Sequence, residues 1–283
     1  MKAKKTSQIL SLLALALLSS CGAKGTSSAD SGVPDGYTLE WSDEFDGTEL
    51  DKANWTPLVG GGGWGNNELE YYQAANATVA DGLLTIAAKK ESMGGCEYTS
   101  SRLVTQRKVS TTYGFCVARI ALPQQNAMWP AFWMLPENGS WPMSGEIDIM
   151  ENRGSSAWTT SGALHHSGAT SSADSYQSKT HSFSQRNGDQ DITAFHTYAV
   201  LWEADQISWF VDGVSFFTVE KRTWHPANGT IYTSDDDAPF NKPFHFILNL
   251  AIGGNFDSAH ASPDADFVNA DMKIDYVRLY SQA

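Results

Sequence analysis

The chain has 283 residues, enough for one large β domain or two small ones, and 41% of them are apolar, as in an ordinary globular protein. Its formal net charge of −13 argues against nucleic acid and against anionic membrane surfaces as partners. The chain is rich in aromatic residues, with 10 Trp, 10 Tyr and 13 Phe, and tryptophan-rich β proteins often bind sugars.

The N-terminus has the pattern of a bacterial export signal. Three lysines precede an apolar run, 9–18, which is too short to span a bilayer as a mature helix. Leu-Ser-Ser-Cys then resembles a lipobox, which predicts a signal peptide over 1–20, lipidation of Cys21 and an exported, membrane-anchored protein. The alternative is an ordinary secretory signal with a chance cysteine. Residues 21–36 are rich in Gly, Ser, Ala and Asp and are expected to form a flexible tether, so the membrane is reached only through the lipid.

Short apolar or alternating runs fill the rest of the chain, and Gly, Pro, Asn and Asp separate them. This spacing is typical of an all-β sandwich or barrel. A single domain over 37–283 is the simplest account, with the first run, 39–41, paired to the last, 276–280. Asp-Gly at 212–213 lies between two such runs and predicts a hairpin.

Three stretches are expected to be loops. Residues 60–68 are rich in glycine, so a ligand can approach the backbone closely, with Trp64 and Asn67 as contacts. Residues 166–194 have few apolar anchors and are expected to form a long surface loop containing at most one short strand. Residues 222–241 are expected to form a second long loop, and loops of this length are usually functional or mobile.

Two cysteines remain in the expected domain, Cys96 and Cys116. In an exported protein such a pair is consistent with a disulfide, and equally with two separate buried thiols. They flank the runs 98–107 and 111–122, which have the pattern of an antiparallel pair. Metal binding by two isolated cysteines is not expected, because zinc sites need more ligands.

The stretch 144–152 carries three carboxylates in one predicted strand. Glu146 and Asp148 are two residues apart and therefore share a face, opposite the intervening isoleucines. Strict alternation would bury Glu151 among those isoleucines at a cost of several kcal/mol. An extra residue near Met150, a β-bulge, would return Glu151 to the acidic face. Carboxylates crowded in this way raise one another's pKa, which indicates acid–base chemistry.

The spacing of the carboxylates favours catalysis over metal binding. A hard cation such as Ca²⁺ takes six to eight oxygen ligands from several segments, and one strand supplies too few. Retaining glycoside hydrolysis uses two carboxyl groups about 5–5.5 Å apart. Long side chains at positions 146 and 151 can lean towards one sugar from a concave strand, which favours retention.

Residues 145–151 resemble the ExDxxE signature of glycoside hydrolase family 16 in its bulged form, and the chain is most similar to the laminarinase-like members. Seven further stretches match the family in order: Trp41–Asp46, Trp64–Tyr72, Tyr98–Leu103, Trp129–Pro136, Phe195–Tyr198, Trp209–Gly213 and Asp275–Arg278. The resemblance implies a β-jelly-roll sandwich of two antiparallel sheets with a substrate cleft across the concave sheet. No cofactor is implied for catalysis.

The resemblance also implies roles for the three carboxylates. Glu146 is expected to be the nucleophile, and Glu151 the general acid and then the general base. Asp148 is expected to hydrogen-bond the nucleophile and, by its charge, to keep the acid protonated at neutral pH.

Further side chains are expected to bind the substrate. Trp129 and Trp141 are expected to stack on sugar faces, and Phe132 is expected in the core. For Trp133 a buried core position is the alternative to a place in the cleft. By resemblance the remaining cleft residues are Trp64, Asn67, Arg102 and His165, with Asn67 and Arg102 on the nonreducing side and His165 beside the acid/base. The choice of His165 over His166 rests on the family pattern alone. Many family members also hold a structural Ca²⁺, and the matching positions are Glu44, Gly82 and Asp275.

The cleft-end loops, which select the sugar, depart from the common pattern of the family. Phe256 stands where laminarinase-like members often have Trp. β-1,3-Glucan is the first expectation and mixed-linkage β-glucan the second, with a β-galactoside in a host or algal glycan as the alternative. A non-catalytic carbohydrate-binding lipoprotein is the remaining alternative. A monomer is expected.

Overall fold

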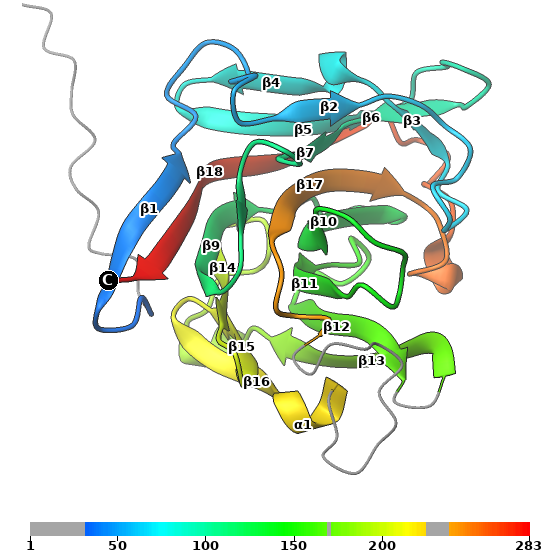
Figure 1. Cartoon of the computed structure of the whole chain (residues 1–283). Coiled ribbons are helices and arrows are strands. Elements are labelled where there is room, and N and C mark those ends of the chain that lie inside the picture. The colour runs from blue at the N-terminus through cyan, green and yellow to red at the C-terminus, as the bar shows by residue number, and fades with distance from the viewer. Residues whose placement is uncertain (1–31, 169–170, 225–237) are drawn as a thin grey trace, which may run out of the picture. The chain divides into compact units, whose positions relative to one another are not determined.

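The computed structural model describes residues 32–168, 171–224 and 238–283, which form two β-sheets around a shared core (Figure 1). The expected all-β sandwich is therefore confirmed. Residues 1–31, which include Cys21 and most of the expected tether, lie outside the described part of the chain, as do residues 225–237 of the second expected loop. Within the described ranges, no helix has the length and apolar character needed to cross a membrane.

The first sheet has ten strands, and the two ends of the domain meet in it. Its order is β16 (Val214–Glu220), β15 (Gln206–Val211), β14 (His196–Trp202), β9 (Gly114–Ala121), β18 (Asn269–Gln282), β5 (Leu83–Lys89), β6 (Tyr98–Ser100) and β3 (Glu70–Tyr72), with β1 (Tyr37–Asp43) paired to β18 and β4 (Ala77–Ala80) to β5. The pairing of β1 with β18 and the β15–β16 hairpin confirm two sequence predictions.

The second sheet has eight strands and carries the functional cleft. Its order is β13 (Ser171–Ser182), β12 (Thr159–Gly168), β11 (Glu146–Glu151), β10 (Met128–Pro136), β17 (Phe244–Ile252), β7 (Arg102–Val104) and β2 (Thr56–Leu58), with β8 (Ser110–Thr111) paired to β17. Strand pairs are antiparallel in both sheets, apart from the parallel pair β3–β6. The helical segments are short: α1 (Lys221–Trp224) and the 3₁₀ turns η1 (Ala74–Asn76), η2 (Gln185–Asn187) and η3 (Ser258–His260).

Apolar side chains from both sheets fill the space between them. Ile147 and Phe246 from the cleft sheet and Ile86 and Val200 from the ten-stranded sheet are completely or almost completely buried in one cluster. Because alternate residues of a strand face opposite sides, this core directs the intervening polar residues of β11 towards the cleft.

The expected antiparallel pair 98–107 and 111–122 is wrong. The first run is split between β6 in the ten-stranded sheet and β7 in the cleft sheet. The second run forms β9, which pairs with β14 and β18. Cys96 and Cys116 are both free thiols, because β9 is separated from the β5–β6 connection by β18 and β5. A disulfide needs Cα atoms within about 7 Å, so the alternative of two separate thiols holds.

The expected loop over 166–194 is also wrong in its first half. Residues 171–182 form β13, which pairs with β12 in a long hairpin from Thr159↔Ser182 to Gly168↔Ser171. β13 is an edge strand, and its outward residues are exposed. A strand with little burial has no apolar alternation, which explains why the sequence pattern missed it.

Candidate active site

The predicted bulge in β11 is present. Opposite β10, Glu151 pairs with Ala131 and Met150 with Phe132, whereas Asp148 pairs with Trp133, so Ile149 is the additional residue. Ile149 and Met150 both lie in the core. The bulge therefore returns Glu151 to the face that carries Glu146 and Asp148, as the sequence predicted.

The opposite sheet holds the bulge in place. Trp209 of β15 donates its indole N–H to the backbone carbonyl of Asp148 at 2.7 Å. The indole packs against Gly162 of β12, where an added Cβ would lie 2.3 Å from Trp209 Cδ1. Glycine at this position is thus required for the close approach that fixes the backbone beside the carboxylates.

The three carboxylates line a cleft of about 790 Å³ on the eight-stranded sheet. Side chains from β7, β10, β11, β12, β13 and β17 and from four loops surround it. The lining residues are Trp64, Gly65, Asn66, Glu68, Arg102, Trp129, Ala131, Trp133, Trp141, Glu146, Asp148, Glu151, Arg153, Ser161, Ala163, His165, Asp174, Tyr176, Ser178, Thr180, Asn249, Asn255 and Phe256. This volume is large enough for a small-molecule-sized ligand.

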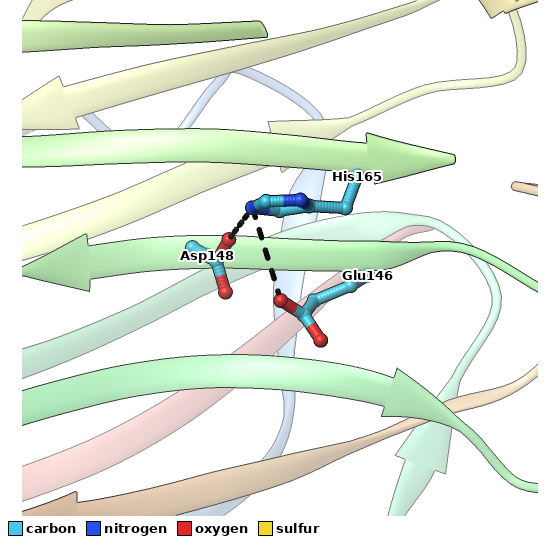
Figure 2. A group of neighbouring side chains, drawn as sticks. All are labelled: Glu146, Asp148 and His165. Carbon is cyan, nitrogen blue, oxygen red and sulfur yellow. Dashed lines mark ion pairs between the residues drawn. The ribbon is translucent and has the colours of Figure 1, made fainter. Parts of the chain in front are cut away.

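His165 bridges two of the carboxylates, as Figure 2 shows: its Nε2 lies 3.4 Å from Asp148 Oδ2 and 3.9 Å from Glu146 Oε1. In register it lies opposite Glu146, so it is beside the expected nucleophile and not, as predicted, beside the acid/base. On its other side, Nδ1 lies 2.9 Å from Asp174 Oδ2 of β13. The Tyr176 ring stacks on the imidazole with centroids 5.3 Å apart.

Burial raises the pKa of all three carboxylates. Burial, opposed by the His165 charge and aided by the Glu151 charge, raises the pKa of Glu146 to about 7. The pKa of Asp148 is raised well above its ordinary value by burial and then by the charges of Glu146 and Glu151. Burial also raises the pKa of Glu151, which accepts a hydrogen bond from Trp129 Nε1 at 2.9 Å. The cluster therefore retains protons near neutral pH.

These pKa directions change the expected role of Asp148. Its side chain is almost completely buried, and Oδ2 has no hydrogen-bond partner within the described structure. A group in this position is most stable when protonated, because burial penalises its charge. A protonated Asp148 hydrogen-bonds Glu146, as expected, and in this form it carries no negative charge towards Glu151.

Glu146, Asp148 and His165 are also the one group of three potential metal ligands found among the described residues, with ligand atoms within 4.8 Å of one another. Two carboxylates and an imidazole fall short of the six to eight oxygens that Ca²⁺ takes. Carboxyl groups whose pKa is raised by burial are suited to proton transfer near neutral pH rather than to binding a hard cation.

Most of the predicted substrate-binding residues do lie in the cleft. Trp129 stacks on Phe256 with ring centroids 4.8 Å apart, and its indole N–H donates a hydrogen bond to Glu151. Trp141 is 56% exposed at the cleft edge, 6.1 Å from the His165 ring. His166 points elsewhere: it is buried, and its Nε2 lies 3.0 Å from Gln177 Oε1.

On the other side of β11, two tryptophans enclose Arg102. The guanidinium carbon of Arg102 lies 5.1 Å from the Trp64 ring centroid and 4.7 Å from that of Trp133. Trp133 is thus a cleft residue, which rules out the alternative of a core position, whereas Phe132 is completely buried in the core, as expected. Asn67 is exposed and does not line the cleft; its amide donates to Asn255 Oδ1, which does, at 2.9 Å.

Several cleft residues were missed by sequence reasoning. Asn249 is a lone amide in the apolar run of β17, and that isolation is a signal that could have revealed it. Glu68 also lines the cleft, and its place in the stretch Trp64–Tyr72, which resembles a family motif, is a signal that could have revealed it. Asp174, Tyr176 and the hydroxyl residues of β13 had no sequence signal, because their strand was not recognised.

The three expected calcium positions converge on one point of β18. This strand pairs with β5 as far as Ile274 and with β1 from Val277 on, so Asp275 lies where the partner changes. Glu44 directly follows β1, and Gly82 directly precedes β5. Backbone carbonyls at strand ends lie outside the regular ladder, and oxygen ligands of this kind suit a hard cation.

A family model described as "Glycosyl hydrolases family 16" matches residues 65–278. The chain is 39% identical to a "Beta-glucanase" of Rhodothermus marinus, in an alignment covering 99% of this chain and 96% of that protein. It is 38% identical over 267 residues to "Glucan endo-1,3-beta-glucosidase A1" of Niallia circulans, covering 87% of this chain but only 38% of that longer protein.

Among solved structures, the chain is similar to an endo-beta-1,3-glucanase from Pyrococcus furiosus. The TM-score is 0.77 at 38% sequence identity, and the match covers 87% of this chain and 95% of that one. Because the match covers most of both chains, the two proteins share the arrangement of the two sheets.

Proposed function

The chain belongs to glycosyl hydrolase family 16, and we propose from this premise that it is a retaining, endo-acting hydrolase of β-1,3-glucan. The observation that carries the proposal is the bulged strand β11, which presents Glu146 and Glu151 on one face of a long open cleft. The two relatives above are named as glucanases, which supports a glucan as the substrate. A jelly-roll fold with a cleft across one sheet suits an internal segment of a polysaccharide.

In the first step, a carboxylate oxygen of Glu146 attacks the anomeric carbon and forms a glycosyl ester. The bond from that carbon to the leaving oxygen breaks, and the proton of Glu151 passes to this oxygen. His165 and Arg102 favour ionised Glu146, because their positive charges lower its pKa. Burial raises the pKa of Glu151, which favours its protonated form as the acid.

In the second step, Glu151 acts as the base. It takes a proton from a water molecule, whose oxygen attacks the anomeric carbon, and the ester bond to Glu146 breaks. Trp129 holds the Glu151 carboxyl group through its indole N–H, so the group faces the same bond in both steps. Two inversions return the original configuration at the anomeric carbon.

The test of this proposal is incubation of the mature domain with laminarin, mixed-linkage glucan, and galactan or mucin glycans. We expect oligosaccharides of several lengths from laminarin, with mixed-linkage glucan second. Products only from the galactose-containing glycans would favour an endo-β-galactosidase. Binding without products from any member of the panel would favour the non-catalytic alternative.

The matched variants are Glu146→Gln and Glu151→Gln. Glu146→Gln replaces a nucleophilic oxygen by an amide of the same shape, so we expect turnover to be lost while the melting temperature is kept. Near-wild-type activity in this variant would contradict the assignment of the nucleophile.

We also propose a structural Ca²⁺ at the point where β18 changes partner. Asp275 would give a carboxylate oxygen, and Glu44 and Gly82 backbone carbonyls; the Glu44 side chain pairs with Arg278. Asp275 Oδ2 also accepts from Arg119 Nη1 at 2.8 Å, so the site shares this carboxylate with a cation. A rise in melting temperature on adding Ca²⁺ after chelation, absent in Asp275→Asn, would support the site; equal melting temperatures would remove it.

We further propose that the protein is exported and lipid-anchored through Cys21. The basic start, the apolar run and the lipobox-like residues support this location. In cell fractionation, Cys21→Ala should move the protein from the membrane to the soluble fraction. Soluble wild-type protein outside the cytoplasm would indicate an ordinary secretory signal instead.

A further inference from the structure

A second pair of carboxyl groups lies beside the cleft, and the proposed mechanism makes no use of it. Glu70 of β3 is completely buried, and Glu68, two residues earlier, is 7% exposed and lines the cleft. The Glu68 side chain lies within hydrogen-bonding reach of Glu70, and this contact raises the pKa of Glu70. Glu70 Oε2 accepts the backbone N–H of Ile252 at 2.7 Å. The second oxygen of Glu70, Oε1, is buried and accepts no hydrogen bond from any donor among the described residues.

This arrangement requires a proton between the two groups. Two adjacent buried carboxylates repel each other and lack solvation, so one of them must be neutral. Burial, followed by the charge of Glu68, raises the pKa of Glu70 well above its ordinary value. A proton on Glu70 supplies the missing donor to Glu68, and Glu68 then remains an acceptor for its other neighbours.

Hydrogen bonds lead from this pair to a cleft tryptophan. Tyr72 donates its hydroxyl to Glu68 Oε2 at 2.9 Å. The Tyr72 oxygen accepts from Asn249 Nδ2 at 3.3 Å. This contact fixes which end of the Asn249 amide faces the cleft, and its Oδ1 accepts the Trp133 indole N–H at 2.7 Å. The orientation of each donor group in this series is therefore fixed by the acceptor that it contacts.

We propose that Glu70 is a positioning residue, which orients Trp133 for a sugar ring beside the scissile bond by acting through Glu68, Tyr72 and Asn249. The inference rests on the proposed function, since it concerns the same cleft and substrate. Glu70 itself is too deeply buried to touch a sugar. The proton on Glu70 determines which group donates in each hydrogen bond of the series. The last of these bonds holds the Trp133 ring towards the cleft.

The direct test follows the indole N–H of Trp133 by ¹H–¹⁵N NMR, with the resonance assigned by its absence in Trp133→Phe. Tyr72→Phe removes one hydroxyl from the series and leaves the buried ring in place. We expect the Trp133 resonance to move and its exchange with water to accelerate in Tyr72→Phe and in Glu70→Leu. Glu70→Gln keeps a neutral donor and acceptor and should restore the wild-type resonance.

The kinetic test separates positioning from stability. In Tyr72→Phe we expect KM for laminari-oligosaccharides to rise about 5- to 10-fold with little change in kcat, as when binding common to ground and transition states is lost. Tyr71→Phe is the matched control on the same strand, where the Tyr71 ring packs against Gly94 instead. It should match the wild type in KM and in the Trp133 resonance.

The outcomes of these experiments distinguish the positioning role of Glu70 from the proposal that the substrate is β-1,3-glucan. An unchanged Trp133 resonance and KM in folded Tyr72→Phe would overturn the positioning role, even if the wild type degrades laminarin. A wild type that leaves laminarin intact would contradict the proposed substrate, yet the NMR comparison would still decide the role of Glu70. If Glu70→Leu does not fold, Tyr72→Phe alone decides it.

Discussion

The two sides of strand β11 present different surfaces to a substrate. On the side of β10, β17 and β7, the rings of Trp64 and Trp133 enclose Arg102, and Trp133 is held by a buried amide. On the side of β12 and β13, small residues and hydroxyls such as Ser178 and Thr180 line the cleft together with His165, Asp174 and Tyr176. We call these the aromatic side and the hydroxyl side.

The difference indicates where binding energy is concentrated. A sugar ring has apolar faces, and a tryptophan ring held in one orientation stacks on them with little further loss of entropy. When a sugar binds, an exposed hydroxyl on an edge strand replaces a hydrogen bond to water with one to the sugar, so the net gain in binding free energy is small. The aromatic side should therefore hold one part of the chain firmly, while the hydroxyl side lets the other part leave.

The strongest test of this contrast compares two aromatic residues. Trp133→Ala should raise KM for laminarin about 30-fold, equivalent to about 2 kcal/mol of lost stacking, with kcat little changed. Tyr176→Ala on the hydroxyl side should raise KM less than about threefold, because that ring is 61% exposed and stacks on His165. Steady-state kinetics with melting temperatures as the folding control measure both, and equal effects would remove the distinction.

A second test concerns Trp129, which joins the aromatic side to the acid/base. In Trp129→Phe the hydrogen bond to Glu151 is lost, and kcat should fall about tenfold. Burial raises the pKa of Glu151, and the Trp129 hydrogen bond lowers it. Without that bond the pKa rises, so Glu151 keeps its proton to higher pH and the alkaline limb of kcat/KM moves upward. A limb at the wild-type pH would show that Trp129 does not act on this carboxyl group.

The strand β11 was predictable because its sequence conflicts with regular alternation. Glu151 could not be buried beside Ile147 and Ile149 without a large cost, so the sequence required a bulge and the structure has one. The pairing of chain ends and the hairpin at residues 212–213 were equally predictable, since apolar alternation and turn residues identify them.

The hydroxyl side was not predictable for the opposite reason. The residues of β13 that face the cleft are polar and exposed, and those on its other face are only partly buried, so its composition resembles that of a loop. The hydrogen-bond series from Glu70 to Trp133 joins residues far apart in the chain, and only the packing of β3 beside β17 makes it visible. Local patterns also gave a false pairing for 98–107, because this run changes sheet at Ser101.

A third test addresses His165, which lies on the hydroxyl side beside Glu146. Burial raises the pKa of Glu146 to about 7, and the positive charge of His165 lowers it. In His165→Gln this lowering is lost, so the nucleophile is protonated at higher pH. The acidic limb of kcat/KM should move upward by about half a unit to one unit, with activity at pH 8 changed less than about threefold. A downward shift would mean that His165 acts on Glu146 by some means other than its charge.

The smallest effect is expected from the hydroxyls themselves. Ser178 lies opposite Ala163 on the cleft face and is exposed. Because water can replace its hydrogen bond to a sugar, Ser178→Ala should change kcat/KM for laminarin less than about twofold. Asn249→Ala on the aromatic side is the matched polar deletion: it leaves the buried indole N–H of Trp133 without its acceptor and should cost about tenfold. If Ser178→Ala proved as costly as Asn249→Ala, the hydroxyl side would bind sugar as firmly as the aromatic side, and release of the product would have to depend on another part of the cleft.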